Sequence, residues 1–89
     1  MHSSFILGTG HYVPNNIITN SDLTDLLNTS DKWIQERTGI KERRWVTKES
    51  GDTAATMGYK AAKLAIKESG LNTKDIDFII FATMTPDYY

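Results

Sequence analysis

The chain has 89 residues, 39% of them hydrophobic and 24% charged, and ten basic against eleven acidic side chains leave a net charge of −1. This length suits one small domain or part of a larger one, and the balanced charge favours neither a nucleic acid nor an acidic membrane surface as partner. The absence of cysteine excludes disulfides and thiolate metal sites, and a first segment without a signal-peptide pattern adds to the expectation of a cytoplasmic protein.

Two short extended segments are predicted near the start of the chain. Phe5–Leu7 is a brief apolar run typical of a buried strand, and Gly8–Gly10 predicts a turn after it. Ile17–Thr19 predicts a second extended piece. Gly8–Gly10 does not begin a dinucleotide-binding fingerprint, because its third glycine is missing and Pro14 disfavours a helix at that point.

Two helices are predicted next. Asn20–Asp22 supplies candidate capping residues for a first helix, which carries leucines at helical spacing within Leu23–Leu27. The polar stretch Asn28–Asp31 ends that helix and caps a second one, which runs through Arg37. Gly39 stands where a left-handed residue ends a helix.

The rest of the chain predicts an α/β arrangement with a central sheet. Ile40–Val46 predicts an extended, largely exposed connection, and Ser50–Thr53 a turn with capping residues. Ala54–Ser69 is the strongest predicted helix, and Gly70 ends it. Ile76–Thr83 predicts a buried strand, and its apolar core is far too short to span a membrane. Small residues on one face of the long helix permit close approach of another element: Ala54, Gly58, Ala61 and Ala65.

Motifs for metal or phosphate chemistry are absent from the sequence. No Gly-Lys-Ser/Thr phosphate loop occurs, and neither His2 nor His11 lies near a paired acidic cluster that predicts a metal site. No serine is marked as a nucleophile. We therefore expect no metal and no bound cofactor.

The segment from Thr29 to Ile40 carries the strongest functional pattern. Trp33 and Arg37 are four residues apart and share one face of a helix, where an indole can stack on a flat heterocycle and a guanidinium can hold a phosphate. The adenosine 3′-phosphate of coenzyme A fits such a pair, and the Thr29 hydroxyl can add a hydrogen bond. Spacing alone also allows a packing role: the indole fills a gap in the core with Arg37 against its ring, and Thr29 caps the helix.

Several segments resemble one known family. Asp31-Lys32-Trp33-Ile34 followed by Arg37-Thr38-Gly39-Ile40 and Glu42-Arg43 resembles the signature of β-ketoacyl-acyl-carrier-protein synthase III. Further segments continue the pattern in the same order: Gly8-Thr9-Gly10-His11-Tyr12-Val13-Pro14, Thr19-Asn20-Ser21-Asp22-Leu23, Thr56-Met57-Gly58-Tyr59 and Asp75–Thr83. The resemblance thus extends over nearly the whole chain.

The resemblance implies a thiolase-type fold of two similar α/β halves, with residues 1–89 as the amino-terminal portion of the first half. Members of the family are acyltransferases, typically homodimers. They condense acyl-CoA with malonyl-acyl-carrier protein to begin fatty-acid synthesis. Acyl-CoA is their substrate, so no separate cofactor is implied.

The resemblance also assigns roles to residues. Trp33 matches a tryptophan that stacks on the adenine of coenzyme A, Arg37 an arginine at its phosphates, and Thr29 a residue bordering the adenine. The catalytic cysteine, histidine and asparagine of the family are expected downstream of Tyr89. We therefore expect no condensing activity from the 89 residues alone, and we expect self-association through exposed apolar surface.

Two alternatives stay open at the level of sequence. The chain can belong to a related starter-unit condensing enzyme of secondary metabolism, because the residues that shape the acyl pocket are mostly downstream in this fold. It can also be a non-catalytic binding or assembly module that uses the Trp33–Arg37 face for a nucleotide or a partner.

Overall fold

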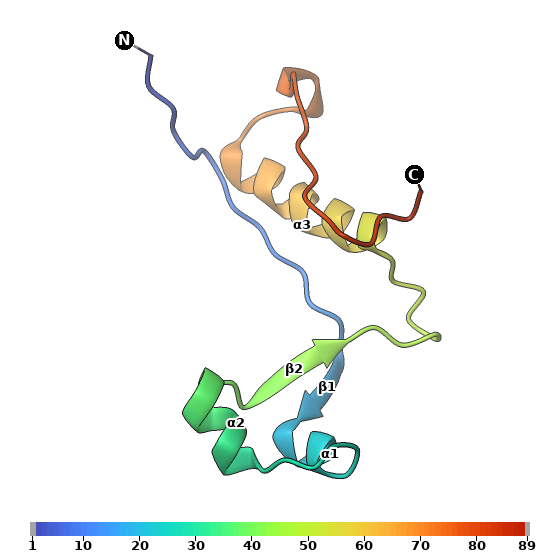
Figure 1. The fold of residues 1–89 in the computed structure, drawn as a ribbon. Helices are drawn as coiled ribbons and strands as arrows, with labels where there is room; N and C mark the ends of the chain where they lie inside the picture. The colour runs from blue at the N-terminus through green and yellow to red at the C-terminus, as the bar shows by residue number, and fades with distance from the viewer. Residues whose placement is uncertain (1, 89) are drawn as a thin grey trace. The chain divides into compact units, whose positions relative to one another are not determined.

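The computed structural model describes residues 2–88, which fall into two compact units. Pro14–Gly51 forms one unit, here called the ribbon unit, and the segments on either side of it form the other, here called the α3 unit. The elements in chain order are β1 (Asn16–Thr19), α1 (Asn20–Thr24), α2 (Asp31–Thr38), β2 (Glu42–Trp45), α3 (Ala54–Ser69) and the 3₁₀ turn η1 (Thr73–Asp75) (Figure 1). The first four belong to the ribbon unit.

The two strands of the ribbon unit pair antiparallel. Ile17 lies opposite Arg44 and Thr19 lies opposite Glu42. The Arg44 side chain adds a further bond just before β1: its Nη1 donates to the carbonyl of Pro14 at 3.0 Å. The predicted extended segments at Ile17–Thr19 and Ile40–Val46 are confirmed, and β2 is largely exposed as expected.

Helix α1 is shorter than its leucine pattern predicts. Thr19 caps it and forms a capping box with Asp22, so the cap lies one residue before the predicted candidates. The helix ends at Thr24, and the backbone amides of Leu26 and Leu27 both turn back to the carbonyl of Leu23. The last two leucines are therefore outside the helix, because the chain tightens into a turn before them.

Helix α2 begins and ends where its residue types predict. The Ser30 hydroxyl accepts a hydrogen bond from the backbone amide of Trp33 at 3.1 Å. Gly39 ends the helix with φ of 71°, a left-handed conformation that glycine adopts without a steric penalty. Ile34, on the inner side of α2, is only 8% exposed, and the other buried residues among residues 2–88 are Pro14 and Asn20.

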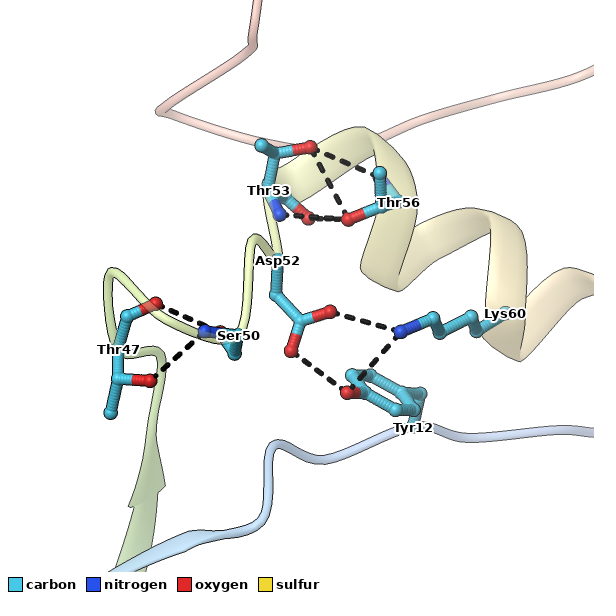
Figure 2. A network of polar contacts seen from close by, with 7 residues as sticks. All are labelled: Tyr12, Thr47, Ser50, Asp52, Thr53, Thr56 and Lys60. Carbon is cyan, nitrogen blue, oxygen red and sulfur yellow. Dashed lines mark hydrogen bonds and ion pairs between the residues drawn. The ribbon is translucent and has the colours of Figure 1, made fainter.

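Helix α3 has the predicted bounds. Thr53 and Thr56 form a reciprocal capping box at its start, which Figure 2 shows, and Gly70 ends it. Among residues 2–88, no helix has both the length and the apolar character needed to cross a membrane.

The extended segment before Val13 packs directly on α3. A Cβ atom at Gly8 would lie 2.8 Å from the backbone nitrogen of Ser69, and one at Gly10 would lie 2.6 Å from that of Ala65. Neither glycine has a positive φ. The prediction of a turn at Gly8–Gly10 is therefore wrong: these glycines are needed for close approach of two backbones.

Two predicted buried strands are absent from residues 2–88. Phe5–Leu7 and Ile76–Thr83 have no strand pairing in the described chain, and Ile79 and Ile80 are 80% and 84% exposed. A strand forms only where a neighbouring strand completes its backbone hydrogen bonds. Neither segment has such a neighbour among the described residues, so both remain extended without entering a sheet.

Candidate functional site

Helix α2 brings the predicted pair of side chains together on its outer surface. The guanidinium carbon of Arg37 lies 5.5 Å from the centroid of the Trp33 ring, a cation–π distance. Trp33 is 53% exposed. The alternative in which this indole fills a gap in the core is therefore not what the structure shows, whereas the contact between the two side chains is present.

An open hollow of about 660 Å³ lies beside the start of α2. It is lined by Leu27, Asn28, Thr29, Ser30 and Trp33. The hydroxyl oxygen of Thr29 is buried and has no hydrogen-bond partner among residues 2–88. The capping role considered for Thr29 belongs instead to Ser30, so the Thr29 hydroxyl is left over for another partner.

Two of the three predicted residues border the hollow. Thr29 and Trp33 line the same hollow, whereas Arg37 contacts Trp33 but is not among the lining residues. The sequence did not point to Leu27 and Asn28 as lining residues, because leucine spacing placed Leu27 in a helix and Asn28 was assigned to the polar stretch that ends it. The end of α1 at Thr24 frees both residues to border the hollow.

Charge is distributed along α2 in a way that matches the helix dipole. Asp31 is in the first turn and Arg37 in the last. The Asp31 carboxylate accepts hydrogen bonds from Gln35 Nε2 at 2.9 and 2.8 Å and from Asn20 Nδ2 at 2.8 Å. These bonds, that of Gln35 foremost, lower the pKa of Asp31 below its ordinary value. Asp31 therefore has a structural role: it links Asn20 to the first turn of α2.

A second polar cluster lies in the α3 unit and joins Tyr12 to two residues that follow it by 40 or more positions. Tyr12 donates its hydroxyl hydrogen to Asp52 Oδ2 at 2.8 Å, and Lys60 Nζ lies 3.0 Å from Asp52 Oδ1 and 4.5 Å from the Tyr12 ring (Figure 2). The Asp52 side chain is 3% exposed. The hydrogen bond from Lys60 to Asp52 is the main cause of a raised pKa for Lys60. Lys60 therefore links the Asp52 carboxylate and the Tyr12 ring.

The side chains gathered at the start and on the outer surface of α2 suggest a binding surface. It presents a flat aromatic surface, a cation and an unpaired hydroxyl, which suit a heterocycle with an anionic group. The sequence contains no thiol. Within residues 2–88 no three side chains of histidine, cysteine, aspartate or glutamate gather as metal ligands.

Comparison with solved structures identifies the class of fold. The chain is similar to the priming β-ketosynthase of the R1128 polyketide biosynthetic pathway, with a TM-score of 0.74 and 30% identity over 81% of this chain and 21% of that one. It is also similar to 3-oxoacyl-[acyl-carrier-protein] synthase III from Aquifex aeolicus VF5, with a TM-score of 0.67 and 48% identity over 74% and 20% of the two chains. The chain therefore has part of a thiolase-type α/β fold of condensing enzymes.

Comparison of sequences identifies the family within this class. The chain is 51% identical over 82 residues to β-ketoacyl-[acyl-carrier-protein] synthase III of Oceanobacillus iheyensis, a match over 92% of this chain. It is 48% identical over all 89 residues to the enzyme of the same name from Clostridium acetobutylicum. The chain belongs to the β-ketoacyl-acyl-carrier-protein synthase III family. It spans about a quarter of the length of these relatives, 26% in both cases, and no family model matches it.

Proposed function

We propose that the chain is part of a condensing enzyme that joins acyl-CoA to malonyl-acyl-carrier protein at the start of fatty-acid synthesis. Within that enzyme, Thr29, Trp33 and Arg37 form a wall of the site for the nucleotide end of coenzyme A. The family relationship supports the overall activity. The arrangement of side chains on α2 and in the turn before it supports the role of these three residues.

The observation that carries the proposal is the unpaired hydroxyl beside the exposed indole. Leaving a buried hydroxyl without a hydrogen bond costs about 1–3 kcal/mol, and the Thr29 hydroxyl is in that condition. Rotation of the Thr29 side chain would turn this hydroxyl toward the hollow, where a purine supplies ring nitrogens and an amino group for it. The flat face of the purine can stack on the Trp33 indole. Arg37, adjacent to the indole, supplies the positive charge for a phosphate.

The chemical step depends on groups outside these residues. A thioester-forming nucleophile in this family is a cysteine, and the sequence has none. The 89-residue chain alone is therefore proposed to be inactive. Incubation with radiolabelled acyl-CoA should leave no acyl group on it; a stable acyl adduct would contradict the proposal.

The role of α2 is tested with two substrates in the complete enzyme that contains these residues. Acyl-CoA carries the nucleotide, whereas the acyl thioester of pantetheine lacks it. Trp33→Ala should raise KM for acyl-CoA about tenfold, since stacking of a base on an aromatic ring contributes about 1–3 kcal/mol. It should leave kcat/KM for the pantetheine thioester unchanged.

Two matched variants refine this test. Thr29→Val keeps the shape of the side chain and removes the hydroxyl, and it should raise KM for acyl-CoA only. Trp45→Ala removes the other tryptophan, which lies on β2, and should have no such selective effect. Equal losses with both substrates in Trp33→Ala would overturn the binding role.

A related starter-unit ketosynthase is the second candidate. The specific observation in its favour is the structural similarity to the R1128 priming ketosynthase, with a TM-score of 0.74. A panel of acyl-CoA chain lengths with the complete enzyme separates the candidates: a preference for the short primers of fatty-acid synthesis supports the first, and a distinct starter unit supports the second. A complete protein that forms no acyl-enzyme would instead be a binding or assembly module.

The exposed apolar side chains of the α3 unit bear on association. The α3 unit exposes Phe78, Ile79 and Ile80 side by side, and contiguous apolar surface of this type drives association. We expect the isolated chain to self-associate and the complete enzyme to be a cytoplasmic homodimer. Light scattering over a range of concentrations tests the first expectation, and a monomer at high concentration would contradict it.

A further inference from the structure

We infer that Asn20 is a positioning residue that fixes helix α2, and with it the binding surface of Trp33 and Arg37. This inference rests on the proposed function of that surface. Asn20 is 1% exposed and is the one buried polar residue among residues 2–88. It is the first residue of α1 and contributes nothing to the hollow itself.

The side-chain amide of Asn20 holds both ends of α2. Its Nδ2 donates to Asp31 Oδ1 at 2.8 Å, at the first residue of the helix. The same nitrogen donates to the carbonyl of Ile40 at 2.8 Å, two residues after the helix ends at Thr38. One amide group therefore bridges the start and the end of an eight-residue helix.

The oxygen of the same amide connects the helix to the strands. Arg43 of β2 donates from Nη2 to Asn20 Oδ1 at 2.7 Å and from Nη1 to the carbonyl of Ile18 in β1 at 3.2 Å. The backbone amide of Asn20 also donates to the carbonyl of Lys41 at 3.1 Å. Both hydrogens and the oxygen of the amide are thus used, and the fixed donors and acceptors around it allow only one orientation of the amide.

The consequence for α2 follows from helix geometry. Asp31 and Ile34 are three residues apart on the side of α2 nearest Asn20: the first is bonded to Asn20 and the second is buried. Trp33 and Arg37 lie on an adjacent face. Because successive residues are rotated by about 100° around the helix, any rotation or sliding of α2 that breaks the bridge also moves the indole relative to Thr29. The bridge therefore sets the geometry of the hollow.

Asparagine is the residue type that this position requires. Asn20→Asp keeps the size and the acceptor for Arg43, but it removes both donors and sets a carboxylate against the Asp31 carboxylate and the Ile40 carbonyl. Gln35 still bonds Asp31 in this variant, so the start of the helix keeps its own support. The expected defect is a misplaced α2, and displacement of a binding group by about 1 Å can cost up to about a hundredfold in rate.

The test uses the complete enzyme and compares acyl-CoA with the acyl-pantetheine thioester. Asn20→Asp should raise KM for acyl-CoA about tenfold while kcat/KM for the pantetheine thioester changes less than twofold. Tyr12→Phe is the matched control, because it removes one hydrogen bond from a polar cluster in the α3 unit. It should affect neither substrate selectively.

Two further variants keep the inference testable if Asn20→Asp does not fold. Arg43→Lys keeps the charge and can make only one of the two bonds to Asn20 and Ile18; we expect about a threefold rise in KM for acyl-CoA. Combining Asn20→Asp with Asp31→Asn exchanges donor and acceptor across the bridge. It should recover part of the acyl-CoA affinity, because the new amide at position 31 donates to the new carboxylate at position 20.

The results separate the positioning role of Asn20 from the proposed binding role of Trp33. Equal losses for both substrates, or no change, in Asn20→Asp and Arg43→Lys would overturn the positioning role while a selective effect of Trp33→Ala left the proposed function intact. If Trp33→Ala itself has no selective effect, the proposed function fails and this inference fails with it.

Discussion

The two units of the chain differ in the interactions that stabilise their helices and strands. In the ribbon unit, side chains from one element complete the hydrogen bonds of another, and the Asn20 amide alone connects α2 with both strands through its partners. In the α3 unit, a single long helix is well capped, yet none of its residues is buried. The comparison teaches that local signals are enough to form a helix, whereas burial requires partners from elsewhere in the chain.

Separate probes can follow the two units. Trp33 and Trp45 are the two tryptophans of the sequence, and both lie in the ribbon unit, so tryptophan fluorescence reports on that unit. Helix α3 is the longest helix of the described chain, so far-ultraviolet circular dichroism reports mainly on the α3 unit. The predictions below use this difference.

The largest effect is expected from Gly10→Ala. The new methyl group would meet the backbone of α3, 2.6 Å from the nitrogen of Ala65, so the extended segment must move away. Overpacking of this kind costs about 1–3 kcal/mol, and we expect the upper part of that range because backbone atoms cannot yield. Circular dichroism during urea denaturation should show the loss, with little change in fluorescence. Ser4→Ala in the same segment is the control, and equal stability of the two variants would contradict the close packing.

A smaller effect is expected from Asp52→Asn. The change removes the charge that Lys60 and Tyr12 contact. Bonds to charged groups contribute about 1.5–3 kcal/mol, but Lys60 is 46% exposed and solvent weakens its share. We expect a loss of about 1–2 kcal/mol, again seen by circular dichroism. Tyr12→Phe should lose less, and a larger loss in Tyr12→Phe would show that the ion pair contributes little.

Removing one helix cap from each unit should give similar losses in different signals. Ser30→Ala and Thr53→Ala each remove a side-chain acceptor at a helix start, at a cost of about 1 kcal/mol. Ser30→Ala should shift the fluorescence transition, and Thr53→Ala the circular dichroism transition. A shift of both signals in both variants would show that the two units unfold together.

The smallest effects are expected from pH, and they have opposite directions in the two units. The pKa of Asp31 is lowered by its hydrogen bonds to Gln35 and Asn20, so its contribution is present above its ordinary pKa and is lost as the pH falls below about 4. The pKa of Lys60 is raised by Asp52, so its contribution is present below about pH 10 and is lost as the pH rises further.

These two effects are measured by comparison with variants. Asp31→Asn should flatten the acid dependence of the fluorescence transition, and Lys60→Gln the alkaline dependence of the circular dichroism transition. Unchanged pH profiles in the two variants would assign the dependence to other groups.

The structural features that were predicted correctly from the sequence alone depend on local interactions. Ser30, Gly39, Thr53 and Gly70 lie at helix ends, where the residue type satisfies backbone groups a few positions away. The contact of Trp33 with Arg37 also follows from spacing, because residues four apart on a helix are neighbours. These features need no knowledge of the rest of the chain. Spacing left a packing role open for Trp33 and Arg37, and the resemblance to a known family favoured the binding role.

The tertiary structure decided the features that depend on distant partners. Asn20 was a plausible capping residue by sequence, but its partners lie up to 23 positions away and make it a buried bridge. Gly8 and Gly10 suggested a turn until the backbone of α3, more than 50 residues later, explained them. Ile76–Thr83 has the composition of a strand but no strand partner among residues 2–88. Composition gives a segment its preference, and only a neighbouring segment can complete its hydrogen bonds and cover its apolar side chains.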